Sequence, residues 1–499
     1  MKLSELTGAA HAPDPDIVGL ASDSRAVKPG YRFAALSGFK VDGGKYIPQA
    51  EENGAAAILA ADGEAKRAVF IRDAQPRRRL AEIAAKFYLR QPETIAGVTG
   101  TNGKTSTARF SAQLWTMLGA GGASLGTLGA AGPNYSKTLA HTTPDPIVLH
   151  QTLDEMTAAG ATHLTMEVSS HALVQHRADG VRFKIAAFTN ITQDHLDYHP
   201  DFESYLAAKT RLFTGLLPKD GVAVVNADGE GGDRVAASAK AAGLRTVTTG
   251  ARGGDLKIVR AAPHPGGRSI DVEHAGGVVA IDFPFIGAFQ AENALLAAGI
   301  VIASGFAAKD VLSLLPKLDG VPGRMQRIVE ENGAAIYIDY AHTPDAIATA
   351  LAAIRPHVRG RLIAIVGAGG DRDKTKRPHM GRAAALGADV VIVTDDNPRS
   401  EDAGEIRRQV LAGAPKAKEI GDRREAIAKA VAMLGDGDVL LIAGKGHETG
   451  QIVRGATLPF DDGATAREEA ARLGGLGASK SGGADKKGND GGGRGGFGR

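Results

Sequence analysis

The sequence predicts an α/β protein of three domains whose sheets are mostly parallel. A chain of 499 residues is too long to bury a single hydrophobic core. Short apolar runs alternate with helix-forming stretches along it, and this order of elements builds a parallel sheet. Polar clusters directly follow several of these runs, and an open sheet places its ligand crevice at the carboxyl ends of its strands.

Composition narrows the class of protein. Hydrophobic residues make up 43% and charged residues 23% of the chain, as in a globular protein. The formal net charge of +3 is too small to indicate nucleic-acid binding, and no apolar run is long enough to span a bilayer. The absence of cysteine excludes disulfides, zinc–thiolate sites and thiol catalysis. The first six residues lack a signal-peptide core, so we expect a cytoplasmic protein. We also expect it to be a monomer that binds neither nucleic acid nor membranes.

Residues 1–92 are predicted to form a small N-terminal α/β domain. The apolar run at 55–60 has strand composition, and a helix containing Ile83, Phe87 and Tyr88 follows it. Gln91 and Pro92 come next, and a proline disfavours helical conformation in the residue before it. We therefore expect the domain to end in a linker at this point.

The second domain opens with a glycine-rich turn. An apolar strand at 95–98 leads into Thr-Gly-Thr-Asn-Gly-Lys-Thr at 99–105, and helix-forming residues follow. Such turns point backbone N–H groups at a phosphate, with the positive end of a helix behind them. The usual pattern has glycine where Val98 stands, so this loop is a tighter variant. An ordinary turn with a surface lysine is the alternative, but the order of strand, turn, Gly-Lys-Thr and helix favours a central P-loop ATPase at 93–321. The expected ATP-binding residues are Gly100, Thr101, Asn102, Gly103, Lys104, Thr105 and Ser106.

Hard oxygen ligands for Mg²⁺ follow further strands of this domain. Strands are predicted at 162–168, 184–191 and 222–226. Thr105 and Glu167, completed by phosphate oxygens, fit the preference of Mg²⁺ for oxygen and water. His195 could serve a second metal, although a lone histidine is more often a hydrogen-bonded structural residue.

The third domain, expected at 322–473, is Rossmann-like. Its predicted strands are 335–340, 362–366, 390–394 and 439–443, and charged clusters follow at 339–345, 369–378, 395–399 and 444–448. Each cluster alone reads as a solvated turn. Four strand ends carrying opposite charges instead indicate a site for a zwitterion or a phosphate, in which Arg pairs with a carboxylate and Glu448 with an ammonium. Residues 474–499 are rich in Gly, Ser, Lys and Asp, which predicts a disordered tail.

Together, the segments 99–105, 166–172 and 194–199 resemble the Mur ligase family, the ATP-dependent amide ligases of peptidoglycan precursor synthesis, and the resemblance runs from 23–25 to about 460–462. The resemblance implies a substrate domain, an ATPase domain and an amino-acid domain, in that order. It further implies ATP and two Mg²⁺ ions, closure of the third domain during the reaction, and the addition of meso-2,6-diaminopimelate to the D-glutamate carboxylate of UDP-N-acetylmuramoyl-L-Ala-D-Glu through an acyl phosphate.

The resemblance also assigns residues at the matching positions. Lys209 would be carbamylated and would bind the second Mg²⁺ together with His195, and both would act in catalysis beside Lys104. His342 is a candidate base. The other implied residues fall into three groups: Ser24, the segment 42–43, Thr142, Thr143, Ser169, Gln175 and Arg177 for the UDP-substrate; Asn293, Arg324 and Asp339 for the nucleotide; and Arg372, Asp396, Asn397, Pro398, Arg399, Gly444 and Glu448 for the amino acid.

Arg399 decides the predicted amino acid. Relatives that add lysine lack an arginine in this motif, whereas diaminopimelate carries a second carboxylate that a guanidinium can bind with two hydrogen bonds. Three departures from the family pattern are Ala368 for cysteine, Gln290 for asparagine and His141 for asparagine.

Other functions remain open from the sequence. A folylpolyglutamate-synthase-like ligase would share the ATPase core, but the motif at 23–25 speaks against it. A P-loop switch or motor would leave the charged clusters of the third domain unexplained. A non-catalytic binding protein would not need Lys104, Glu167 and Lys209.

Overall fold

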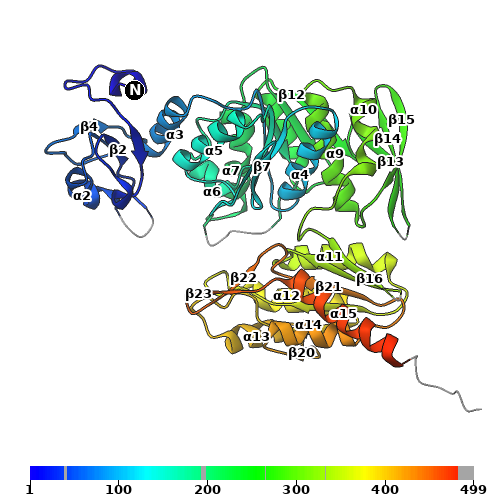
Figure 1. Cartoon of the computed structure of the whole chain (residues 1–499). Coiled ribbons are helices and arrows are strands. Elements are labelled where there is room, and N and C mark those ends of the chain that lie inside the picture. The colour runs from blue at the N-terminus through cyan, green and yellow to red at the C-terminus, as the bar shows by residue number, and fades with distance from the viewer. Residues whose placement is uncertain (39–41, 193–197, 265, 332, 481–499) are drawn as a thin grey trace, which may run out of the picture. The chain divides into compact units, whose positions relative to one another are not determined.

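The computed structural model describes residues 1–38, 42–192, 198–264, 266–331 and 333–480 (Figure 1). It divides into two compact units. The first comprises residues 1–325, 348–357 and 372–376, and the second comprises 326–347, 358–371 and the chain from Arg377 onward. Both units contain sheets that are wholly or mostly parallel, which confirms the predicted α/β class. In the described part of the chain, no helix is long and apolar enough to cross a membrane.

The N-terminal part of the first unit is a small parallel sheet with hydrophobic clusters on its two faces. The run expected at 55–60 forms β3, and the predicted helix ends at Phe87, before Gln91 and Pro92. Its strands are β1 (Gly19–Ala21), β2 (Tyr31–Ala34), β3 (Ala57–Ala60) and β4 (Val69–Arg72); its helices are α1 (Leu3–Thr7), η1 (Ser24–Ala26), η2 (Gly43–Tyr46), α2 (Ile47–Glu52) and α3 (Pro76–Phe87).

The remainder of the first unit is built on a large mixed sheet. Among the described residues the strand order is β15-β14-β13-β12-β11-β10-β5-β9-β6-β7-β8. The middle strands are parallel, and antiparallel strands extend both edges. The strands are β5 (Thr94–Thr99), β6 (Gly122–Gly126), β7 (Gly129–Gly132), β8 (Tyr135–Lys137), β9 (His163–Glu167), β10 (Phe183–Phe188), β11 (Val222–Asn226), β12 (Arg245–Gly250), β13 (Leu256–His264), β14 (Gly267–His274) and β15 (Gly277–Phe283).

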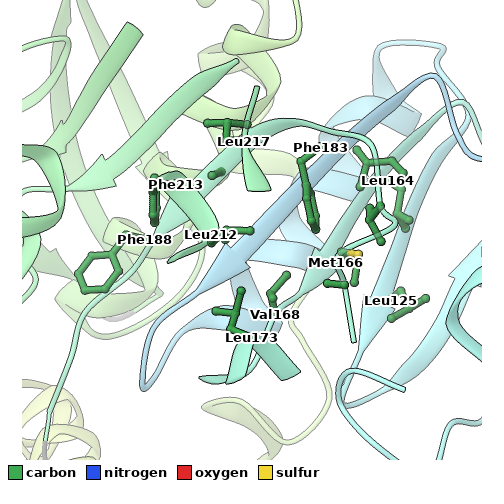
Figure 2. Packing of buried hydrophobic residues seen from close by; sticks show 14 of the residues in the cluster. Leu125, Leu164, Met166, Val168, Leu173, Phe183, Phe188, Leu212, Phe213 and Leu217 are labelled. Atoms are coloured by element: carbon green, nitrogen blue, oxygen red, sulfur yellow. The ribbon is translucent and has the colours of Figure 1, made fainter. Parts of the chain in front are cut away.

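Helices cover both faces of this sheet (Figure 1). Alternate residues of the buried strands point to opposite faces, so Ile95 joins one hydrophobic cluster and Ala96 the other. Figure 2 shows the first cluster, in which Met166, Phe183 and Leu212 are all nearly fully buried. The helices are α4 (Lys104–Met117), α5 (Pro146–Ala158), α6 (Ser170–Val174), α7 (Phe202–Arg211), η3 (Leu212–Leu216), α8 (Gly232–Ala241), α9 (Ala288–Ala303), α10 (Ala308–Ser313) and η4 (Leu315–Lys317).

The second unit has a sheet of order β16-β17-β21-β18-β19-β20 in which only β16 is antiparallel to its neighbour. All four predicted strands are present, with ends shifted by at most one residue. The strands of this sheet are β16 (Gln326–Glu331), β17 (Ala334–Asp339), β18 (Leu362–Val366), β19 (Val390–Val393), β20 (Lys418–Glu419) and β21 (Val439–Ala443). A separate antiparallel pair consists of β22 (Gly450–Val453) and β23 (Ala456–Pro459).

The last helix of the second unit runs further than the sequence indicated. α15 (Asp462–Lys480) continues past Gly474, where the disordered tail was expected to begin. Residues 481–499 of that tail lie outside the described residues. The other helices after residue 326 are α11 (Pro344–Ile354), η5 (Arg355–His357), α12 (Lys376–Gly387), α13 (Ala403–Leu411) and α14 (Arg423–Ala432).

His150 on α5 makes the first unit sensitive to acid. Its ring is fully buried, neither ring nitrogen has a hydrogen-bond partner among the described residues, and a side chain at Gly180 would contact Nε2. Burial disfavours the charged ring and lowers the pKa of His150 to about 4. The folded protein therefore binds fewer protons at His150 than the unfolded chain, in which the pKa of histidine is about 6.5, so stability is lost as the pH falls from about 6.5 to about 4.

We expect His150→Leu to remove up to about 3 kcal/mol of this acid-induced loss. The check is the difference in melting temperature between pH 7 and pH 5, measured by calorimetry. His379→Gln is the control, because His379 is exposed and its replacement should leave the pH dependence unchanged. Equal acid sensitivity in the wild type and His150→Leu would contradict the assignment.

Candidate active site

The glycine-rich loop connects β5 to α4, as predicted. Gly103 is the residue before the helix and has a φ of 85°, and Gly100 has a φ of 147°. Both values lie in the region that favours glycine. A Cβ at Gly100 would overlap Thr189 Oγ1, and a Cβ at Gly103 would overlap Asn293 Oδ1. The loop therefore requires glycine at both positions, and Asn293, predicted to bind the nucleotide, does lie beside it.

The chain after β10 holds the loop in shape. Thr189 Oγ1 donates a hydrogen bond to the Asn102 carbonyl (2.6 Å), and the Asn190 side chain accepts one from Asn102 N–H (3.1 Å). Thr101 N–H donates to the Asn190 carbonyl at 2.8 Å. These contacts fix the loop before any phosphate binds, which lowers the cost of ordering it around a ligand.

Two lysines contact the carbonyl of Gly100. Lys104 Nζ donates to the carbonyls of Gly100 (2.9 Å) and Thr101 (2.8 Å). Lys209 Nζ, on α7, donates to the same Gly100 carbonyl at 2.8 Å and lies 4.3 Å from the ring centroid of Tyr205. Lys209 is 1% exposed. The structure therefore brings together Lys104 and Lys209, which are 105 positions apart in the printed sequence, at one edge of the loop.

Thr105 and Glu167, the predicted magnesium ligands, follow or end neighbouring strands. Thr105 is the second residue of α4, which follows β5, Glu167 ends β9, and β5 pairs with β9. The Thr105 hydroxyl accepts a hydrogen bond from Arg324 Nη2 at 3.0 Å, so Arg324 also reaches the loop. Glu167 Oε1 accepts from Thr127 N–H at 2.8 Å. Both side chains offer the hard oxygen atoms that Mg²⁺ prefers.

No group of three or more His, Cys, Asp or Glu side chains suited to a metal occurs among the described residues. A magnesium ion fits this donor set even so, since Mg²⁺ commonly takes only one or two protein ligands and completes its shell with water and phosphate. His195, the predicted ligand of a second ion, lies outside the described residues.

The residues predicted for the muramoyl-dipeptide gather around Glu167. The Thr143 hydroxyl donates to the Glu167 carbonyl (3.0 Å) and accepts from Ser169 N–H (3.1 Å). Arg177 Nη1 donates to the Thr143 carbonyl at 2.8 Å, and Arg177 Nη2 donates to Gln175 Oε1 at 2.8 Å. Burial lowers the pKa of the Arg177 guanidinium, and a substrate anion there would compensate for this desolvation.

Thr142 and Ser24, two further residues predicted to bind the UDP-substrate, lie in different parts of the first unit. The hydroxyl of Thr142 lies 3.0 Å from that of Thr127, which also contacts Glu167. Ser24 belongs to the small N-terminal sheet region, where its hydroxyl donates to Gln49 Oε1 at 2.7 Å. Its role with the UDP group stays a prediction, as does that of the segment 42–43.

Four of the residues predicted to bind the amino acid lie in a buried polar cluster of the second unit. Glu448 Oε2 accepts from Asn397 Nδ2 (2.8 Å) and from Lys445 Nζ (3.1 Å), and Lys445 Nζ also donates to Asn397 Oδ1 (3.1 Å). Lys445 is fully buried. A Cβ at Gly444, whose φ is 115°, would overlap Asp396 Oδ2. Asp396, Asn397, Gly444 and Glu448 are therefore neighbours, as the sequence predicted.

Arg399 is held at the edge of this cluster. Its φ of 53° is left-handed, its N–H donates to the Ile452 carbonyl (2.9 Å), and its Nη1 donates to the Gly370 carbonyl (2.8 Å). Pro398, just before it, is buried. Arg372 is exposed and is grouped with the first unit, so its place relative to Arg399 stays a prediction.

The strand end after β17 carries Asp339 and His342. The Asp339 carbonyl accepts from Gly444 N–H at 3.1 Å. His342 Nδ1 lies 2.8 Å from the Tyr340 carbonyl, which can only accept, so Nδ1 carries the proton. Asp339 and His342 belong to the second unit and Asn293 and Arg324 to the first, so a shared nucleotide site remains a prediction.

Arg423 binds the backbone at the ends of two strands, β19 and β21. It is fully buried and paired with the equally buried Asp462 (2.7 Å). Its Nη2 donates to the Ala443 carbonyl at 2.9 Å and its Nη1 to the Asp395 carbonyl at 3.3 Å. These carbonyls immediately precede Gly444 and Asp396.

Sequence reasoning missed several residues of the two regions. Thr127 and Asn190 each make contacts that only the tertiary fold creates. Lys445 lies inside the charged cluster at 444–448, but the sequence did not assign it a role. A buried lysine needs a partner, and its position between a strand end and Glu448 could have predicted the ion pair.

Comparison with known proteins agrees with this geometry. Three family models cover most of the chain: "Mur ligase family, catalytic domain" at residues 16–88, "Mur ligase middle domain" at 98–301, and "Mur ligase, glutamate ligase domain" at 323–446.

Curated relatives are similar over nearly the whole chain. A protein of Bradyrhizobium diazoefficiens named UDP-N-acetylmuramoyl-L-alanyl-D-glutamate–2,6-diaminopimelate ligase is 49% identical over 475 residues, which cover 93% of this chain and 97% of the relative. The protein of that name from Caulobacter vibrioides is 48% identical over 470 residues, covering 92% and 97%.

Solved structures agree in fold. A structure of UDP-N-acetylmuramoyl-L-alanyl-D-glutamate–2,6-diaminopimelate ligase matches with a TM-score of 0.69 at 33% identity, covering 95% of this chain and 99% of that one. A MurF ligase from Thermotoga maritima in complex with ADP has a TM-score of 0.61 at 18% identity, with 93% and 98% covered, which shows the shared fold. From the family models and the near-complete similarity to these relatives, the chain belongs to the Mur ligase family.

Proposed function

We propose that this chain is an ATP-dependent ligase that joins meso-2,6-diaminopimelate to the D-glutamate carboxylate of UDP-N-acetylmuramoyl-L-Ala-D-Glu in peptidoglycan precursor synthesis, forming ADP and phosphate. The observation that carries the proposal is the near-complete similarity to relatives named for this reaction. The glycine-rich loop of the first unit, which Lys104 contacts, and the polar cluster of Asn397, Lys445 and Glu448 in the second unit support the proposal.

The first step activates the substrate carboxylate. A carboxylate does not react with an amine at neutral pH, because its leaving group would be oxide. A carboxylate oxygen therefore attacks the γ-phosphorus of ATP, the bond from that phosphorus to the β–γ bridging oxygen breaks, and ADP leaves. The product is an acyl phosphate. Phosphoryl transfer depends mainly on positioning and on neutralising charge, which Lys104 and the N–H groups of the loop provide.

Bound magnesium would add charge neutralisation on the phosphate oxygens. Thr105 and Glu167 would hold one ion. Carbamylated Lys209 would help to hold a second with His195. The burial of Lys209 beside the Gly100 carbonyl supports this role, because it places the side-chain nitrogen next to the glycine-rich loop.

The second step forms the amide. The amine nitrogen of diaminopimelate attacks the acyl carbon, the carbon–oxygen bond to the phosphoryl group breaks, and phosphate leaves. The amino group is an ammonium at neutral pH, and it must lose a proton before its nitrogen can attack. His342 is the proposed base, because its hydrogen bond to the Tyr340 carbonyl orients the ring and places the basic lone pair on Nε2.

The amino acid is recognised by charge. Arg399 would bind the distal carboxylate of diaminopimelate, and Glu448 with Asp396 would attract its ammonium. Lys445 and Asn397 both bind Oε2 of Glu448, so the carboxylate is fixed in one orientation before the substrate arrives. We propose further that the protein acts as a cytoplasmic monomer.

The deciding assay measures phosphate release with UDP-N-acetylmuramoyl-L-Ala-D-Glu, ATP and Mg²⁺, with and without diaminopimelate, and then with a panel of amino acids. Release that requires both substrates and prefers diaminopimelate supports the proposal. Release with a folate and glutamate instead would favour a folylpolyglutamate synthase, whose fold is also similar at a TM-score of 0.61.

We expect Lys209→Ala to lower the rate constant for ligation by about 100-fold or more, because a ligand of the transferring phosphoryl group's metal is lost. Lys240→Ala on α8 removes an exposed lysine instead and should leave the rate unchanged. Incubation with ¹³C-bicarbonate should give a carbamate signal by NMR in the wild type and none in Lys209→Ala. A wild type with full activity and no such signal would remove carbamylation from the mechanism.

A further inference from the structure

The turn after α6 carries a backbone conformation that its sequence does not favour. Gln175 ends the helix and His176 follows with a φ of 55°. Arg177 N–H donates back to the Ala172 carbonyl (2.9 Å), and His176 N–H donates to the Leu173 carbonyl (3.3 Å). This is the helix ending in which the left-handed residue is usually glycine. A histidine at that position costs free energy, so other contacts must hold it there.

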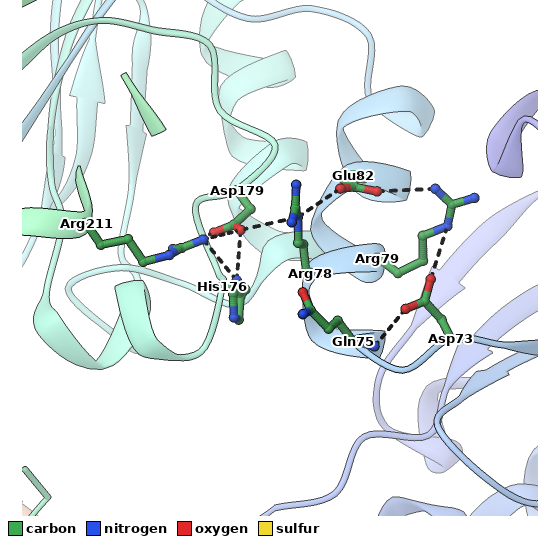
Figure 3. A network of polar contacts seen from close by, with 8 residues as sticks. All are labelled: Asp73, Gln75, Arg78, Arg79, Glu82, His176, Asp179 and Arg211. Atoms are coloured by element: carbon green, nitrogen blue, oxygen red, sulfur yellow. Dashed lines mark hydrogen bonds and ion pairs between the residues drawn. The ribbon is translucent and has the colours of Figure 1, made fainter. Parts of the chain in front are cut away.

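A buried carboxylate supplies such contacts (Figure 3). His176 Nδ1 lies 2.8 Å from Asp179 Oδ2, and Arg211 donates to both oxygens of Asp179, at 2.9 and 2.5 Å. Arg211 Nη2 also lies 3.0 Å from His176 Nδ1, so the imidazole, the carboxylate and the guanidinium contact one another. The Asp179 side chain is only 4% exposed. Burial would raise the pKa of Asp179, but the hydrogen bonds from Arg211 and His176 outweigh it and lower the pKa.

Arg211 links this turn to the phosphate loop. It is the last residue of α7 and also donates to the Leu173 carbonyl near the end of α6 (3.0 Å). The same helix carries Lys209, on the Gly100 carbonyl, and Tyr205, whose hydroxyl lies 3.1 Å from Thr101 Oγ1. One rigid helix therefore contacts the phosphate loop with two side chains and the Gln175–His176–Arg177 turn with a third.

We propose that His176, Asp179 and Arg211 form a positioning network that holds this turn in its left-handed conformation, so that Gln175 and Arg177, the residues on either side of His176, face the UDP-muramoyl-dipeptide. The inference rests on the proposed function, because it concerns the binding of that substrate. None of the three residues needs to touch the substrate, since the ring of His176 acts through Asp179, Arg211 and the backbone.

Two substitutions at one position test this mechanism. His176→Ala removes the ring but keeps a side chain in the left-handed region, whereas His176→Gly removes the ring and the conformational cost together. We expect His176→Ala to raise the KM for the UDP-substrate about tenfold, with kcat and the KM values for ATP and diaminopimelate nearly unchanged. His176→Gly should stay close to the wild type, and Asp179→Asn, which keeps an acceptor but loses the charge, should lie between them.

Arg234→Ala is the matched control. Arg234 pairs with Glu203 of the same α7 at 2.6 Å, but both side chains are more than half exposed, so all KM values should stay at wild-type level. Equal effects of His176→Ala and His176→Gly would mean that the ring itself contacts substrate and would overturn the positioning role. An unchanged KM in His176→Ala, or an equal rise in the KM for ATP, would overturn it too. A wild type without turnover on these substrates would instead overturn the proposed function.

Discussion

Lys104→Ala should reduce ATP-dependent ligation by at least about 1,000-fold, because phosphoryl transfer then proceeds without the ammonium that neutralises charge on the outer phosphates. In the structure, Lys104 Nζ rests on the carbonyls of Gly100 and Thr101, within the loop itself. Those carbonyls can bind water once the side chain is gone, and the loop keeps its contacts with Thr189 and Asn190. The loss should therefore be chemical and not structural.

Substrate binding and the rate of a control variant distinguish a chemical loss from a structural one. Titration calorimetry with UDP-N-acetylmuramoyl-L-Ala-D-Glu should show that Lys104→Ala still binds that substrate, because Thr143, Ser169 and Arg177 hold one another without Lys104. Lys86→Ala, at an exposed lysine of α3, should ligate at the wild-type rate. Ordinary turnover in Lys104→Ala would show that another group performs its task.

Arg399→Ala should abolish the preference for diaminopimelate. Removing a charged partner from a desolvated pair costs about 2–5 kcal/mol, which lowers kcat/KM for diaminopimelate by about 30-fold to several thousand-fold. Lysine has no second carboxylate, so its poor kcat/KM should not fall further. The structure supports a specific role for this side chain, because Gly370 orients the guanidinium and the Ile452 carbonyl fixes the backbone.

The measurement is kcat/KM for diaminopimelate and for lysine in each variant. Arg382→Ala removes an exposed arginine of α12 and should keep the wild-type ratio. Because a φ of 53° is more costly for alanine than for glycine, Arg399→Gly provides a second variant with the same expected loss of preference. Selectivity that survives in both would exclude Arg399 from recognition.

The sequence predicts local features of this molecule well. The glycine-rich loop between β5 and α4 and strands such as β11 and β18 follow from short-range patterns, in which an apolar run is followed by glycine or a charged cluster. The edge strands of the central sheet were not predicted, because β13 is mostly exposed and lacks a clear apolar run. α15 extends past Gly474 since the preceding turns, anchored at Asp462, already supply a template on which further residues add.

Contacts between distant polar residues escape such patterns. Asn190 reaches Asn102 across 88 positions, and Arg423 reaches Asp462 across 39. The neighbouring residues do not predict either partner, because the local sequence around a polar residue at a strand end is the same whether its side chain contacts water, a ligand or another loop. Lys209 illustrates the point: on its own helix it reads as a surface lysine, and only the fold places it under the Gly100 carbonyl.

The buried Arg423–Asp462 pair has a consequence for biosynthesis. Asp462 begins the last helix, and its partner Arg423 holds the carbonyls that precede Asp396 and Gly444. A nascent chain that has not yet emerged from the ribosome as far as Asp462 would have to bury a cation without its counter-charge. The strand ends that Arg423 supports therefore cannot adopt their final structure until translation passes this aspartate. A premature stop codon upstream of Asp462 would yield a protein with a complete glycine-rich loop at 99–105 but without the ordered strand ends before Asp396 and Gly444.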